Sequence, residues 1–99
     1  MATPADRVSL VMSANRALWG EISSAVRAVF VRSDDADIHV RFVFDGPISD
    51  EDRESLSCVG TEMVADFPDH GVCEDGVRVD MPNPVPRQEG WIPVFRRKE

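Results

Sequence analysis

The most regular pattern in this sequence is an alternation of apolar and polar residues between positions 37 and 45. One set of alternate positions carries only large apolar side chains, namely Ile38, Val40, Phe42 and Phe44. A period of two residues is typical of a β-strand with one face against a core. The preceding segment, residues 24–32, is rich in β-branched and aromatic residues, and Ser33-Asp34-Asp35-Ala36 has turn chemistry. These segments predict a β-hairpin over residues 24–45.

Two other segments have the spacing of a helix. The clearer one carries an apolar stripe at Leu56, Val59, Gly60, Met63 and Phe67. Ser49 is a good N-cap for it, and Pro68 is a stop signal, so a helix is predicted over residues 49–67. Apolar residues at helical spacing, with Leu18 or Trp19 as the last of them, predict a second helix over residues 5–21.

The remainder of the chain predicts two more strands, over residues 72–81 and 91–96. Pro93 cannot donate to a strand ladder, which favours a place at a sheet edge for the last strand. The whole chain, residues 1–99, is therefore expected to form one α+β domain with the order α-β-β-α-β-β. We expect a two-layer sandwich in which two helices cover one face of a four-stranded antiparallel sheet. The other face would then be open, with Arg27, Val29, Val31 and Val43 on it.

Charge is distributed unevenly along the chain. Residues 34–80 contain fourteen acidic and three basic residues, which leaves −11 in that window, whereas the whole chain carries −7. Such a field repels nucleic acid and anionic membranes and attracts basic proteins. A solvated surface with no partner is the simplest alternative, because acidic surfaces also favour solubility. No apolar run approaches the length of a membrane span, and no secretory signal is visible, so the expected compartment is the cytoplasm.

The sequence shows no set of catalytic residues. His39 and His70 are the candidates for a general base, and neither has partners that the sequence reveals. Cys58 and Cys73 lack the spacing of a zinc site, and the acidic residues lack the spacing of a calcium loop. We therefore expect no enzyme, no metal and no cofactor. A small hydrolase or metal-dependent enzyme that uses the acids and His39 is the last-ranked alternative.

Four segments carry a resemblance to a known family: residues 18–22 (LWGEI), 26–29 (VRAV), 38–49 (IHVRFVFDGPIS) and 58–68 (CVGTEMVADFP). With these segments, the chain resembles a family of small bacterial proteins that includes the immunity proteins of contact-dependent growth inhibition systems. The resemblance implies a cytoplasmic protein that binds and neutralises the toxin domain of a delivered effector. Such toxins are commonly nucleases, and the basic cleft of a nuclease would suit an acidic inhibitor.

The candidate toxin-binding residues rest on charge clustering alone. They are the acids of the predicted turn and of the start of the second helix: Asp34, Asp35, Asp37, Asp45, Asp50, Glu51, Asp52 and Glu54. The expected partner is a basic toxin domain, with no nucleic acid and no membrane. The alternative is a self-associating structural or interaction module, in which the open sheet face pairs two copies as a homodimer.

Overall fold

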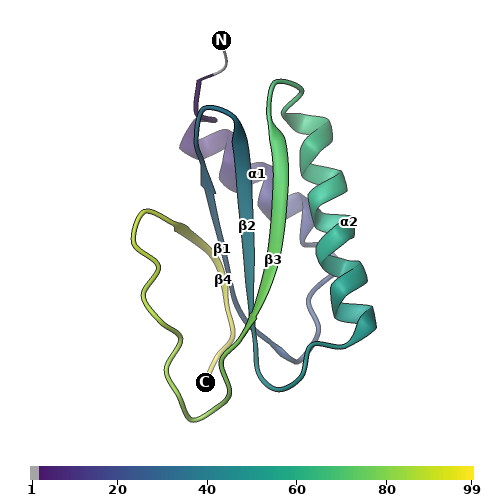
Figure 1. Ribbon diagram of the computed structural model, residues 1–99, viewed down its shortest axis with the longest axis vertical. Helices are drawn as coiled ribbons and strands as arrows, with labels where there is room; N and C mark the ends of the chain where they lie inside the picture. Colours follow the sequence, from purple (N-terminus) through teal and green to yellow (C-terminus); the bar gives the residue numbers. More distant parts are fainter. Residues whose placement is uncertain (1–2) are drawn as a thin grey trace.

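The computed structural model describes residues 3–99, and these form two helices and one four-stranded sheet (Figure 1). The elements are α1 (Arg7–Ala17), β1 (Val26–Ser33), β2 (Asp37–Phe44), α2 (Asp50–Asp66), β3 (Gly71–Arg78) and β4 (Ile92–Arg96). The expected order of helices and strands is correct. Residues 1 and 2 of the predicted domain lie outside the described residues.

The expectation of an antiparallel sheet is wrong. The strands lie in the order β3-β2-β1-β4, and β3 runs parallel to β2, while β1 is antiparallel to both β2 and β4. The reason is the helix between β2 and β3. Its 17 residues span roughly 25 Å, which is about the length of the eight-residue strand β2. The helix thus returns the chain to the end of the sheet where β2 began, and β3 starts from there in the same direction.

Both helices pack on one face of the sheet, as expected. The core between the layers contains Leu10 and Ala14 of α1 together with Leu56, Val59 and Met63 of α2. The sheet contributes the apolar set of β2 that the alternation predicted, and also the buried side chains of Val26, Val29 and Val31. In Figure 1, α1 lies behind the strands and α2 runs beside β3. Within residues 3–99, no helix is both long enough and apolar enough to cross a membrane.

The first helix is shorter than the predicted range 5–21. It begins after Asp6, whose side chain accepts a hydrogen bond from the backbone N–H of Ser9, and it ends at Ala17 with Leu18 as its C-cap. The chain then turns through Gly20, which has a φ of 76°. Trp19 lies in this turn, and its side chain is 86% exposed. Of the two alternatives for the last apolar helix position, Leu18 joins the core and Trp19 does not.

The second face of the sheet is not open, contrary to expectation. The connection from β3 to β4 passes from one edge of the sheet to the other, and Val79, Val85 and Trp91 pack against Ala28, Phe30 and Val43. The four residues expected on an exposed face are all at most 2% exposed: Arg27, Val29, Val31 and Val43. A bulge in β1 between Val26 and Ala28 shifts the register, and Val29 and Val31 belong to the helix-covered core. The face proposed for self-association is thus inside the protein.

The start of α2 uses the predicted cap. The hydroxyl of Ser49 accepts a hydrogen bond of 3.1 Å from the backbone N–H of Asp52. Asp50, Glu51 and Asp52 lie in the first turn, where the unpaired N–H groups and the positive end of the helix dipole favour negative charge.

We expect Ser49→Ala to lower the free energy of unfolding by about 1 kcal/mol, because the substitution leaves the Asp52 N–H without its acceptor. Urea denaturation would measure this as a lower midpoint with an unchanged slope. Ser57→Ala, at an exposed position within the same helix, is the matched control and should cause no loss. Equal midpoints for the two variants would contradict the role of the cap.

Candidate functional site

The eight acidic residues predicted to bind a partner lie near the two opposite ends of β2. Asp34, Asp35 and Asp37 lie at the hairpin turn, and the other five lie beyond Phe44. An eight-residue strand is roughly 26 Å long, so the two groups are separate. The structure therefore does not bring the eight carboxylates into one cluster, and each group has its own environment.

At the hairpin turn, the Asp34 carboxylate is hydrogen-bonded within the protein. One oxygen of its carboxylate accepts hydrogen bonds from the backbone N–H groups of Asp37 (2.7 Å) and Ala36 (2.9 Å), and the other lies 3.0 Å from Nε2 of His39. The bond from the Asp37 N–H, followed by those from His39 and Ala36, lowers the pKa of Asp34 to about 2. This carboxylate closes the turn, whereas Asp35 beside it is exposed.

The same turn contains the grouping most like a metal site. Asp34, Asp37 and His39 each offer one ligand atom, and these atoms lie within 4.8 Å of one another. The Asp34 carboxylate, however, already accepts hydrogen bonds on both oxygens, and the guanidinium of Arg32 lies 3.9 Å from one of them. A cation would have to displace these donors, so the arrangement favours a hydrogen-bonded turn. The other histidine, His70, lies with its Nε2 2.7 Å from the backbone oxygen of Thr3.

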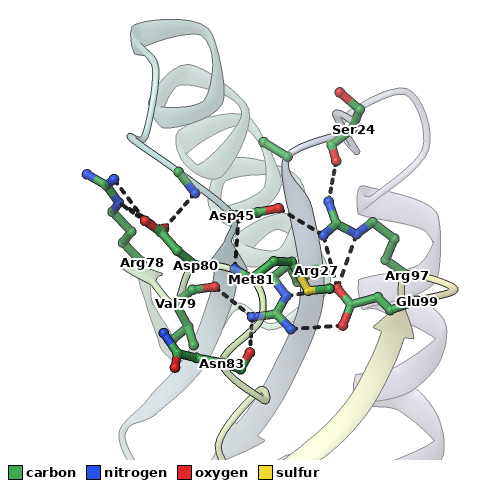
Figure 2. Close-up of polar contacts among 12 residues, drawn as sticks. Ser24, Arg27, Asp45, Arg78, Val79, Asp80, Met81, Asn83, Arg97 and Glu99 are labelled. Atoms are coloured by element: carbon green, nitrogen blue, oxygen red, sulfur yellow. Dashed lines mark hydrogen bonds and ion pairs between the residues drawn. The ribbon is translucent and has the colours of Figure 1, made fainter.

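At the other end of β2, Asp45 takes part in a network that joins the β3–β4 connection to the sheet (Figure 2). One oxygen of Asp45 accepts a hydrogen bond of 3.1 Å from the backbone N–H of Met81, and the other lies 3.2 Å from the guanidinium of Arg97. Arg97 also donates to the backbone oxygen of Ser24 at 2.7 Å. Asp45 thus holds three segments together, and a partner would compete with these donors for its carboxylate.

Arg27 is the buried centre of this network. Its guanidinium donates to both oxygens of Glu99, at 2.8 and 2.9 Å, and to the backbone oxygens of Val79 and Asn83, both at 2.7 Å. The side chain is 2% exposed. The hydrogen bonds from Arg27 lower the pKa of Glu99 to about 2. A buried guanidinium requires such partners, so the path of the chain through Val79 and Asn83 depends on it.

The acids at the start of α2 divide by exposure. Asp52 is 7% exposed, while Asp50, Glu51 and Glu54 are exposed. The carboxylates of these three exposed acids make no hydrogen bond or ion pair with any residue from 3 to 99. They are therefore the members of the predicted set, together with Asp35, that the fold leaves free to meet a partner.

A groove between α1 and α2 adjoins this group. Its larger part is a hollow of about 600 Å³, lined by Trp19 and Glu21 after α1 and by Glu54, Cys58 and Glu62 of α2, among others. A smaller hollow of about 300 Å³ shares Glu21, Glu54 and Cys58 with it and adds Glu51. We name these two adjoining hollows the α1–α2 groove. Its exposed aromatic ring and four carboxylates make it a surface suited to cationic groups.

A second hollow, of about 590 Å³, lies beside Trp91 on the other face of the sheet. The ring of Trp91 already has cationic neighbours: the guanidinium carbons of Arg32 and Arg41 lie 5.2 and 4.6 Å from its centroid. Arg41 is in turn paired with Asp75 at 2.9 Å. Trp91 is thus part of an internal stack that helps to close the second face.

Sequence reasoning missed the contribution of Trp19, Glu21 and Glu62. The helical spacing leaves Leu18 and Trp19 as alternatives for the last apolar helix position, and it does not indicate that Trp19 is exposed. The helix ends at Ala17, four residues before the predicted end, and the Trp19 side chain in the turn that follows is exposed. Glu62 lies one α2 turn beyond Cys58 on the same face, and its spacing of eight from Glu54 is a signal of a shared helix face that could have found it.

Because the pKa of Glu99 is about 2 in the fold and 4.5 in its ordinary state, its contribution to stability is complete above about pH 4.5. The contribution is lost as the pH falls from about 4.5 to 2, since the unfolded chain then binds the proton first. We expect Glu99→Gln to lower the stability at pH 7 and to flatten its decline over this window. Urea denaturation at pH 7, 4.5, 3.5 and 2.5 would measure both effects.

Glu89→Gln is the matched control, because Glu89 is exposed and its side chain pairs with no group among the residues that the structure describes. It should leave the acid profile as it is in the natural sequence. An acid profile of the Glu99 variant that parallels the unaltered protein would contradict the coupling of Glu99 to Arg27.

The chain is similar to a family of known proteins. No curated protein matches it. The profile of the MafI2 immunity protein family matches residues 7–99, which covers both helices and all the strands described above. The match confirms the expectation of an immunity-protein family, and it does not confirm the contact-dependent growth inhibition type. Because the match spans nearly the whole sequence, the chain belongs to the MafI2 immunity protein family.

Proposed function

We propose that this protein neutralises a cognate toxin by binding to it, as a non-enzymatic inhibitor. Membership of the MafI2 immunity protein family is the observation that carries the proposal. Within residues 3–99, neither histidine has a hydrogen bond to a serine, threonine or cysteine side chain: His39 is bonded to Asp34, and His70 to the Thr3 backbone. A binding role in the cytoplasm, with no cofactor, requires only a stable fold and a complementary surface.

The toxin-facing surface in this proposal is acidic, and the toxin is a basic protein such as a nuclease. Of the eight acids proposed from the sequence, the exposed ones at the start of α2 are the best placed: Asp50, Glu51 and Glu54. Their carboxylates have no partner among residues 3–99, so a basic protein need not displace an internal ion pair. Asp34 and Asp45 hold turns and loops, and Asp52 is largely buried.

The first experiment is co-expression with the toxin domain encoded by the neighbouring reading frame. We expect growth to be rescued and the two proteins to purify as a complex with a Kd in the nanomolar range. A wild-type protein that neither rescues growth nor forms a complex with this toxin would overturn the proposal.

The acidic surface is tested by Glu51→Gln combined with Glu54→Gln, which retains Asp50 at the helix start. We expect the association rate at low salt to fall about fivefold and its salt dependence to become weaker, because surface charges act mainly on the encounter. Stopped-flow mixing at several salt concentrations would measure both. The matched control, Asp69→Asn with Glu89→Gln, removes the same net charge at exposed positions elsewhere and should have a much smaller effect. Equal effects of the two pairs would refute the assignment of the surface.

A further inference from the structure

The most exposed large apolar side chain among residues 3–99 is Trp19, at 86%. Tryptophan is costly to leave in water, and it is the residue type most enriched among the energetic centres of protein interfaces. Trp19, which follows α1, lines the α1–α2 groove together with Glu54 and Glu62 of α2. The ring and carboxylates of another element thus line the same hollow.

The carboxylates of the groove are available for a partner. Glu21, Glu51, Glu54 and Glu62 form no side-chain hydrogen bond or ion pair within the described part of the chain. Among the described residues that line the groove, Arg16 is the one cation, and it is paired with Asp66, which also accepts a hydrogen bond of 2.7 Å from Ser13. The groove thus has an excess of unpaired negative charge around an exposed ring.

The two tryptophans of this protein provide an internal comparison. Trp91 has guanidinium groups at 4.6 and 5.2 Å from its ring centroid, whereas no cation lies over Trp19 in residues 3–99. A cation over an indole face is attracted by the ring quadrupole, and neighbouring carboxylates strengthen this attraction. Arginine side chains of this protein thus occupy the face of the Trp91 ring, and no such cation from the described residues occupies the face of the Trp19 ring.

We propose that the α1–α2 groove receives a basic segment of the toxin, with a lysine or arginine side chain over the Trp19 ring and its charge next to Glu54 and Glu62. The proposal rests on the toxin-binding function proposed above and identifies where the partner is anchored. Complementarity of charge selects the occupant, since a second copy of this acidic chain would bring like charge into the groove. In this arrangement Trp19 contributes mainly to the affinity of the complex. The carboxylates increase the rate of association with the toxin and orient its basic segment.

The test is Trp19→Ala, with the toxin domain of the neighbouring reading frame as the probe. We expect the Kd to rise about 30-fold or more, mainly through faster dissociation. Glu62→Gln, at the far end of the groove from the α2 start, should weaken binding about fivefold and reduce its salt dependence. The melting temperature of both variants should remain unchanged, because both positions are exposed.

Met12→Ala is the matched control, since Met12 is 62% exposed on α1 and does not line the groove. Its Kd should remain that of the unaltered protein. Labelling with 5-fluorotryptophan provides a second measurement that does not require a substitution in the complex. We expect the ¹⁹F signal of Trp19 to shift on addition of toxin, and that of Trp91 to remain in place.

The outcomes separate this proposal from the proposed function. In one outcome, the unaltered protein binds the toxin tightly, Trp19→Ala binds equally well, and the Trp19 signal does not shift. This result would refute the proposal that the toxin binds in the α1–α2 groove, and it would leave the proposed toxin-binding function supported. If the unaltered protein does not bind the toxin, the proposed function fails, and the groove proposal fails with it. A Trp19→Ala protein with lost affinity and an intact fold would support both.

Discussion

The direction in which the chain leaves α2 is the constraint on which the rest of this fold depends. The helix and strand β2 have nearly the same length, so the crossover from the end of β2 must deliver β3 parallel to β2 at one edge of the sheet. Two edges then remain free, one beside β3 and one beside β1, and β4 occupies the edge beside β1. The connection between these edge strands consequently crosses the second face, and it covers apolar residues that the helices cannot reach.

The connection between β3 and β4 supplies hydrogen-bond acceptors for the buried side chain of Arg27, and Arg27 in turn holds this connection against the sheet. The residues from 79 to 91 contain no helix or strand, and two of their backbone oxygens, those of Val79 and Asn83, accept hydrogen bonds from the buried Arg27. Arg27 projects from the bulge in β1 and satisfies two of these oxygens, while Glu99 balances its charge from beyond β4. Each partner would be unfavourable alone, because an unpaired charge at such a position is poorly solvated. Together they fix the loop to the sheet.

The acidic residues of this chain divide into two functional classes for the same reason. Asp34, Asp45 and Glu99 have hydrogen-bonding partners in the fold and act as internal acceptors. The acids around the α1–α2 groove have none within residues 3–99, and they surround an exposed tryptophan. A count of charges along the sequence cannot distinguish the acids that are bonded within the fold from the acids that are not. Only the second class can exchange water for the cations of a partner without loss of an existing bond.

Local chemistry in the sequence determined the type and approximate position of each element. The alternation at Ile38 to Phe44 and the Ser49 cap with its apolar stripe specify β2 and α2, because strand and helix periods and caps are short-range properties. Tertiary structure decided the rest. The parallel direction of β3, the burial of Arg27 and the outward position of Trp19 depend on which elements pack together, and periodicity carries no information about strand direction. The candidate site likewise combines residues far apart in sequence, Trp19 and Glu21 with Glu54 and Glu62, which become neighbours only because both helices need the same apolar face of one sheet.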